Sequence, residues 1–239
     1  MQYLMMPLDA HYDLGFGAIA EAFRSSAMKL KEANPEPAFF DHLPLSFLHR
    51  HASELFLKSE IVILHRRLRL PYGTEPYNAT PMVSVNRGWK PIYNVHSIAV
   101  LYAYWKALIT PRTEELRDMC KCKPDWTIQP EADEWVRIIE AVDPHSTYSR
   151  YPSVRDPLED KAKSPFKEMT SEKLFPPDRS PERKIMALII ENADGDFVRA
   201  YANEKGVEPN GTYMNALEQL NEMLFNYHAM MRFELTGGF

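Results

Sequence analysis

The sequence predicts an all-α protein, a helical bundle that carries a long proline-rich loop and one small hairpin. The chain has 239 residues, 45% of them hydrophobic, with only 9 glycines against 19 prolines. So few glycines disfavour a fold built on hairpin turns or on glycine-rich phosphate-binding loops. The length and the apolar content suffice for one buried core, so we expect a single domain over residues 1–239.

Helices are predicted wherever apolar residues recur at intervals of three or four and a proline, asparagine or glycine ends the run. The first predicted helix shows the pattern, because Phe16, Phe23 and Leu30 share one face and Asn34-Pro35 follows. The predicted helices cover residues 15–33, 44–68, 95–109, 113–120, 131–142, 180–190, 197–203 and 212–233. Two short apolar runs on either side of Asn86-Arg87-Gly88 predict the hairpin.

Residues 143–179 lack helical periodicity and are rich in proline. Segments of this length without regular structure are usually functional or disordered. We therefore expect an irregular loop here, layered on a core that comprises residues 12–142 and 180–235.

The formal net charge of −5 provides no bulk attraction for nucleic acid. The densest basic run lies at the end of the second predicted helix, where Arg66, Arg67 and Arg69 follow His65. These three arginines are candidate nucleic-acid contacts, and the alternative is that they are simply the solvated end of a helix.

Cys120 and Cys122 are the only cysteines, too few for a tetrahedral zinc site and too close in sequence for an unstrained disulfide. We expect free thiols in a reducing compartment, with no metal and no cofactor. The N-terminal segment shows no secretory signal pattern, and no apolar run is long enough to span a bilayer. The predicted location is therefore the cytoplasm, without a membrane partner.

The second predicted helix carries a line of charge. Arg50, Glu54 and Lys58 are spaced four residues apart, so Glu54 can pair with both cations along one side. Nearly every other side of this helix is apolar, which predicts a central position in the bundle and partial burial of the charges. One further side is polar and is expected to face solvent: His49, Ser53 and Glu60.

Two interpretations of this line of charge remain open, because buried charges are costly unless they are paired. In the first, the three residues form an intrahelical ion ladder that fixes the packing of the bundle. In the second, Arg50, His51, Glu54 and Lys58 line a cleft. Arg50 would then offer a fork for phosphate, and His51 would exchange a proton near neutral pH.

Two other segments could complete such a cleft. His96 stands at the start of the third predicted helix, where free backbone N–H groups favour anions, and the alternative is an exposed or capping histidine. Arg150 and Tyr151 follow the end of another predicted helix and could close the site from a loop. The alternative for them is a loop that Tyr151 anchors to the surface.

These segments resemble a family. The run RHASELFLK at residues 50–58 is similar to the R-H-x-x-E-L-x-L-K helix of HEPN-like bacterial proteins. Three later features resemble the same group in the same order, and the resemblance spans residues 47–152: His96-Ser97 with Leu101 and Trp105, then Asp143 with Ser146, then Arg150-Tyr151-Pro152.

The resemblance implies an all-α bundle, often dimeric, in prokaryotic conflict systems such as toxin–antitoxin modules, abortive infection and phage defence. Active members are metal-independent endoribonucleases with the signature R-x4–6-H. This sequence departs from that signature, because no arginine has a histidine five to seven positions later.

The first hypothesis is an RNA-acting HEPN-like effector. His51 and His96 would transfer protons, Arg50 and Arg150 would bind phosphate, and Glu54 would orient Arg50. A second hypothesis is a non-catalytic HEPN-like module that recognises a nucleotide or a partner protein of the same system. A phage or host structural protein is a third possibility, in which these residues have no common site.

Overall fold

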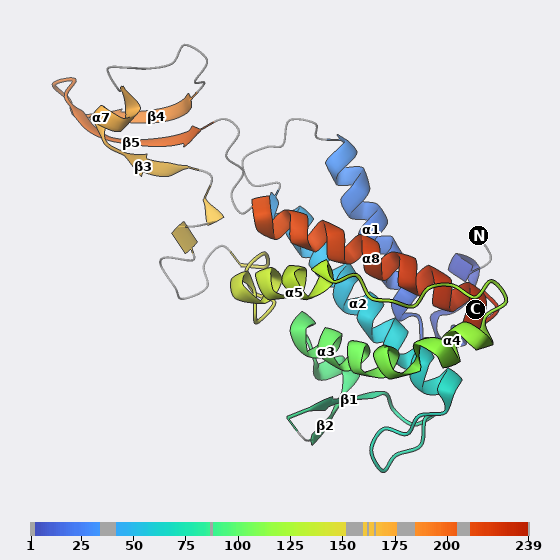
Figure 1. Ribbon diagram of the computed structural model, residues 1–239. Helices are drawn as coiled ribbons and strands as arrows, with labels where there is room; N and C mark the ends of the chain where they lie inside the picture. The colour runs from blue at the N-terminus through green and yellow to red at the C-terminus, as the bar shows by residue number, and fades with distance from the viewer. Residues whose placement is uncertain are drawn as a thin grey trace.

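A computed structural model of the chain describes residues 3–33, 42–86, 88–151, 160–161, 163–164, 166–175, 185–204 and 211–238. About 60% of the structure is helical, and the described residues form two small antiparallel sheets with five strands in total. The prediction of an all-α fold is therefore wrong, and the fold is mixed α/β (Figure 1).

The long helices lie close to where the sequence predicts them. Their bounds are α1 Phe16–Ala33, α2 His42–Leu68, α3 Ile98–Ile109, α4 Thr113–Met119, α5 Glu131–Val142 and α8 Gly211–Leu235, with a single turn, α7, at Ser171–Leu174. Short 3-10 turns occupy Tyr3–Met5, Leu8–Ala10, Ile92–Asn94 and Thr110–Arg112. The main difference is at α3, which begins three residues later than expected because Ser97 is its N-cap and accepts a hydrogen bond from the Val100 N–H at 3.2 Å.

The predicted small hairpin is confirmed. Strand β1, Met82–Val85, pairs with β2, Gly88–Pro91, in antiparallel register. The Tyr72 and Trp89 rings meet edge to face, with centroids 6.4 Å apart, and the Tyr72 ring also stacks on the buried His65 of α2 at 4.0 Å. These ring contacts link the hairpin and the loop before it to the bundle.

The second sheet is where the sequence prediction fails. Its strands β3 Lys167–Met169, β4 Ile185–Glu191 and β5 Phe197–Glu204 lie in the order β3-β5-β4 and are antiparallel. The sequence predicts helices over residues 180–190 and 197–203, and both predictions are wrong wherever the structure describes these residues. The residues between the strands explain the difference, because the Asn192 side chain accepts hydrogen bonds from the backbone N–H of Asp194 and Asp196 and folds the chain into a hairpin.

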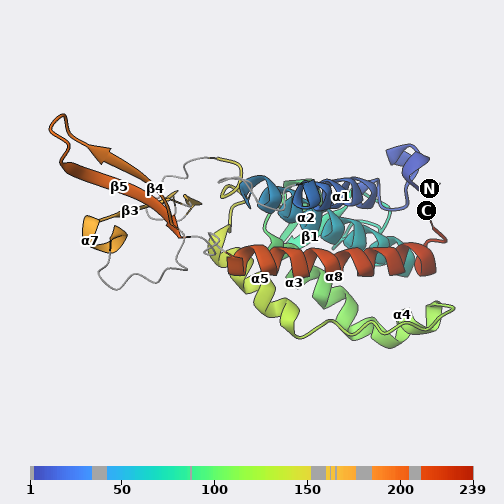
Figure 2. The ribbon, with the colours of Figure 1, turned by 90° about the horizontal axis from the view of Figure 1, so that it is seen from above.

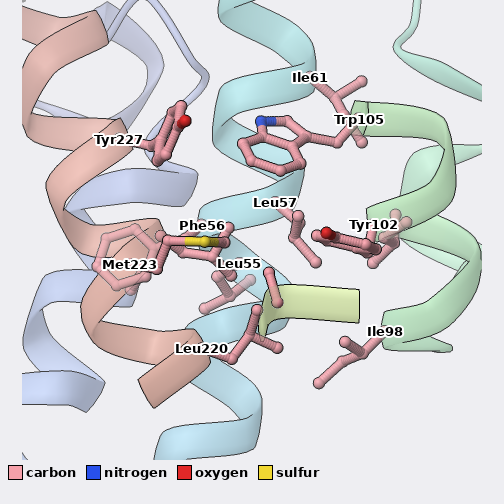
Figure 3. Close-up of a cluster of buried hydrophobic side chains, with 14 of the residues drawn as sticks. Leu55, Phe56, Leu57, Ile61, Ile98, Tyr102, Trp105, Leu220, Met223 and Tyr227 are labelled. Carbon is pink, nitrogen blue, oxygen red and sulfur yellow. The ribbon is translucent and has the colours of Figure 1, made fainter. Parts of the chain in front are cut away.

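Helix α2 is the centre of the bundle, as the sequence predicts. Figure 3 shows it between α8 and α3, whose Tyr227 and Trp105 rings meet edge to face with centroids 5.1 Å apart. The main apolar core gathers side chains from α1, α2, α3, α5 and α8, while the sheet of β3, β5 and β4 has a small separate cluster. Both ribbon views place that sheet beyond one end of the helices (Figures 1 and 2).

The expected solvent face of α2 is also buried, so that prediction is wrong. His49 is 6% exposed, and Ser53 and Glu60 are fully buried. Helix α8 covers this side, and Asn221 donates hydrogen bonds to the His49 carbonyl at 3.3 Å and to the Ser53 hydroxyl at 3.2 Å. Among the described helices, none combines the length and the apolar character that a bilayer crossing needs.

Candidate functional site

The three charged residues of α2 form a buried ladder. One Glu54 oxygen accepts a hydrogen bond from Lys58 Nζ at 2.8 Å, and the other lies 3.5 Å from Arg50 Nη1. No more than 4% of any of the three side chains is exposed. Lys58 therefore behaves as the ion-ladder interpretation expects: its ammonium is buried against Glu54 and does not face a ligand.

Arg50 additionally joins three separate parts of the chain. Its Nη1 donates to the Ser146 hydroxyl at 2.6 Å, and its Nη2 donates to the His96 carbonyl at 3.0 Å. Its Nε lies 2.9 Å from an Asp143 carboxylate oxygen, an ion pair whose angle falls outside hydrogen-bond geometry. The guanidinium is thus occupied by the protein itself, and Arg50 acts as an internal clamp instead of the predicted phosphate ligand.

The segment after α5 is shaped to receive this clamp. Asp143 is the C-cap of α5, and its Oδ1 accepts hydrogen bonds from the backbone N–H of Thr147 at 2.7 Å and Tyr148 at 3.1 Å. Ser146 adopts a left-handed φ of 60°, which turns the chain so that its buried hydroxyl meets Arg50. Asp143 therefore neutralises Arg50 and fixes the turn at the same time.

His96 is the exposed member of the cluster. Its Nδ1 lies 3.0 Å from the same Glu54 oxygen that binds Lys58, and its side chain is 54% exposed. Burial would raise the pKa of Glu54, but the Lys58 ammonium and the hydrogen bond from His96 outweigh it and hold that pKa below its usual value. An ionised carboxylate only accepts, so Nδ1 is the donor in this pair, and in the neutral tautomer Nε2 is the acceptor nitrogen.

His51 lies apart from these hydrogen bonds. Its ring stacks on Phe47 at 5.7 Å between centroids and meets Phe23 edge to face at 4.5 Å. Burial lowers its pKa, so the imidazole is neutral at pH 7. The structure therefore places His51 in an aromatic contact beside the cluster, and it does not show the predicted pairing of His51 with His96.

Arg150 and Tyr151 follow the clamped turn. The Arg150 guanidinium is exposed and lies over the Phe47 ring, 5.5 Å from its centroid. Tyr151 is 56% exposed, so its side chain does not anchor the loop to the surface. Its backbone carbonyl instead accepts a hydrogen bond from Lys163 at 2.8 Å. Of the cations predicted for the site near the N-terminal end of α2, Arg150 is therefore exposed, whereas Arg50 and Lys58 are buried.

The basic run lies at the other end of α2. Arg66 stands sixteen positions after Arg50, or about 24 Å along a helix at 1.5 Å per residue. Arg66 donates a hydrogen bond to the Tyr12 carbonyl at 2.7 Å, whereas Arg67 and Arg69 are exposed. The three arginines are therefore separate from the cluster around Arg50, and Arg66 has a structural partner.

Sequence reasoning assigned no role to Asp143 or Ser146, although both stand in the segment that resembles the HEPN-like group. Sequence spacing could not show that residues 93 and 96 positions after Arg50 bind its side chain. Cys120 is buried and Cys122 exposed, and both are free, as predicted. A hollow of about 330 Å³ lined by parts of β3, α7 and β5 contains none of these residues.

No group of three or more His, Cys, Asp or Glu side chains in the described part of the chain is arranged to hold a metal ion. Comparisons with protein-family models, with curated proteins and with solved structures find no match for this chain.

Proposed function

We propose that this chain is a HEPN-like helical protein of a prokaryotic defence or toxin–antitoxin system that acts on RNA in the cytoplasm as a metal-independent endoribonuclease. The observation that carries the proposal is the Glu54–His96 pair. A buried carboxylate fixes the tautomer of an exposed imidazole, and this arrangement suits a general base.

The chemistry needs one proton acceptor and one cation. His96 Nε2 takes the proton from a ribose 2′-hydroxyl, and the 2′-oxygen attacks the adjacent phosphorus. The bond to the 5′-oxygen breaks, and that oxygen takes a proton from water, which leaves a 2′,3′-cyclic phosphate and a 5′-hydroxyl. Arg150 is the cation suited to the charge that develops on phosphate, and Arg50 serves as a positioning residue.

A second candidate is a non-catalytic HEPN-like module that binds a nucleotide or a partner protein at the same surface. Two observations favour it. The Arg50 guanidinium is fully occupied inside the protein, and the His51 ring packs against Phe23 and Phe47. The absence of R-x4–6-H from the sequence points the same way. A structural protein of a phage or host gains no support from contacts that join Arg50, Glu54 and His96.

The test is RNA cleavage in EDTA by the purified chain, by His96→Ala and by His145→Ala. His145 is an exposed histidine in the same turn region, so it is the matched control. The proposal expects cleavage by wild type and by His145→Ala, with a loss of at least about 100-fold in His96→Ala because general-base catalysis contributes that much. Binding of RNA without cleavage would favour the second candidate, and equal cleavage by all three proteins would place the activity elsewhere.

A further inference from the structure

Strand β4 has an open edge. It lies at one end of the strand order β3-β5-β4, so within the described residues only β5 pairs with it. An edge strand presents unpaired backbone N–H and C=O groups on its outer side. In Figure 1 this edge lies on the side of the sheet away from the helical bundle.

The strand is also apolar on both faces. Opposite residues in an antiparallel pair share a face, so Leu188 lies with Tyr201, and Ile189 lies with Ala200. Leu188 is 61% exposed and Ile189 40%. Two more apolar side chains flank Leu188 on its face of the sheet: Met186, 56% exposed, and Ile190, 38% exposed.

The two edges of this sheet differ in charge. The opposite edge strand, β3, is short and carries Lys167 and Glu168, which are charges of the kind that protect an edge from pairing. Strand β4 has seven residues and carries no charge before Glu191 at its end. The edge that lacks protection is therefore the long apolar one, which marks it as a pairing surface.

The sheet buries little by itself. Among the residues that the structure describes, its own apolar cluster consists of Leu174, Ala200 and Ala202, with Met169 packed against them. A three-stranded sheet needs a substantial hydrophobic face or a covering helix to be stable, and α7 is a single turn. Further strands on the β4 side would supply the missing apolar contacts.

We propose that β4 pairs with β4 of a second copy of this chain, in antiparallel orientation about a two-fold axis at Leu188. This register pairs all seven residues, with Leu188 against its own copy and Met186 against Ile190 of the partner subunit. The two sheets become one continuous sheet in the order β3-β5-β4-β4-β5-β3.

The charge pattern selects a second copy over a different partner. β4 has no charged side chain at its centre to recognise an acidic or basic peptide, while its own sequence is complementary to itself. In the paired sheet the two central strands are apolar before Glu191, while Arg199 lies on β5 and Glu168 on the outer strand β3. No like charges meet across the interface, as expected for an apolar centre with a polar rim.

The first test is the mass of the full chain in solution at micromolar concentration, measured by light scattering or sedimentation. Wild type is expected at twice 27.7 kDa, and Leu188→Lys at 27.7 kDa, because the change places two ammonium groups face to face at the axis. Met28→Lys, at a side chain of α1 that is 42% exposed, is the matched control and stays dimeric. Circular dichroism confirms that each variant is folded.

The second test fixes the register, in a Cys122→Ser background that removes the exposed native thiol. Leu188→Cys is expected to form an intermolecular disulfide on mild oxidation, since residues that face each other lie about 4.5–5.5 Å apart between Cα atoms. Met186→Cys is the control and stays reduced, because its own copy is four positions away. A monomeric wild type, or a dimer that survives Leu188→Lys, would overturn the proposal, which does not depend on any activity toward RNA.

Discussion

The Nη2 atom of Arg50 donates a hydrogen bond to the backbone carbonyl of His96 at 3.0 Å, across 46 positions of sequence. Through this bond the N-terminal part of α2 holds the residue that stands just before the N-cap of α3. The same guanidinium binds Asp143 and Ser146, so one side chain aligns the exposed His96 with the turn that leads to Arg150. Arg50 therefore holds the bundle together and, through the same contacts, fixes the position of the proposed site.

Removal of the clamp should cost a large part of the stability. Arg50→Met leaves the buried carboxylate of Asp143 without its cation, whereas Glu54 keeps Lys58. We therefore expect a loss of about 3–5 kcal/mol in the free energy of unfolding. Arg50→Lys should lose less stability than Arg50→Met, because the ammonium keeps the positive charge. It should still be less stable than wild type, because an ammonium cannot reach all three partners of the guanidinium. Urea denaturation measures both.

The control for this change is Arg137→Met, which breaks an exposed pair with Glu134 on α5. This variant should unfold at nearly the same urea concentration as wild type. If Arg50→Met were equally mild, the buried cluster would not hold the bundle together.

The buried Glu60 should make the protein less stable as the pH rises. Burial raises its pKa well above the usual value, and the indole N–H of Trp105 faces it without reaching hydrogen-bond geometry. A group whose pKa is higher in the folded protein than in the unfolded chain contributes its full stabilisation at pH values below the unfolded pKa, here near 4.5. That stabilisation is lost as the pH rises toward the pKa in the folded protein.

Glu60→Gln removes this titration. Relative to wild type, the variant should therefore gain stability as the pH rises above the unfolded pKa, as measured by urea denaturation at each pH. Glu32→Gln, at an exposed position in α1, is the control and should show no such trend. A difference between Glu60→Gln and wild type that is the same at every pH would contradict the assignment.

Gly17 should not tolerate alanine, although alanine normally favours a helix. A Cβ at this position of α1 would lie 2.0 Å from His228 Nε2 and 2.7 Å from Asp13 Oδ2. Asp13 is held in place, because its Oδ2 accepts hydrogen bonds from the Ser59 hydroxyl and from the Gly17 N–H, and His228 Nε2 lies 3.7 Å away. These contacts outweigh the effect of burial and lower the pKa of Asp13 to about 2. We expect Gly17→Ala to lose roughly 1–3 kcal/mol, as overpacked cores do.

Thermal unfolding checks this, with Gly88→Ala as the control. A Cβ at Gly88 would meet nothing closer than 3.6 Å, so that variant should melt near the wild-type temperature. A Gly17→Ala variant that melts at a higher temperature than wild type would contradict this prediction, because it would show that α1 and α8 can move apart at this point without loss of stability.

The long helices could be predicted because local signals define them. Asn34-Pro35 follows α1, and the spacing of Arg50, Glu54 and Lys58 gives the observed pairs on α2. The apolar run of β4 carries no such signal, since a short buried helix and a strand have the same composition. Its pairing with β5 depends on the turn at Asn192, whose side-chain hydrogen bonds override the helical reading.

The rest of the site depends on contacts between distant segments. Glu60 and His49 look like a solvent face until α8 covers them, and nothing near them in sequence indicates Asn221 as a partner. Ser146 meets Arg50 only because of its left-handed backbone conformation, which is uncommon for serine. The sequence pattern indicates Arg50 and His96 as site residues. It does not show that Arg50 is buried as an internal clamp and that the imidazole of His96 is exposed.

The most direct test of the proposed function compares a mixed-sequence RNA pool with the same pool carrying 2′-O-methyl groups, in EDTA, with wild-type protein. The Glu54–His96 pair predicts cleavage of the unmodified pool alone, because the 2′-hydroxyl proton must pass to His96. The upstream products should end in 2′,3′-cyclic phosphate. Cleavage of the 2′-O-methyl pool, or no cleavage of either pool, would contradict the account.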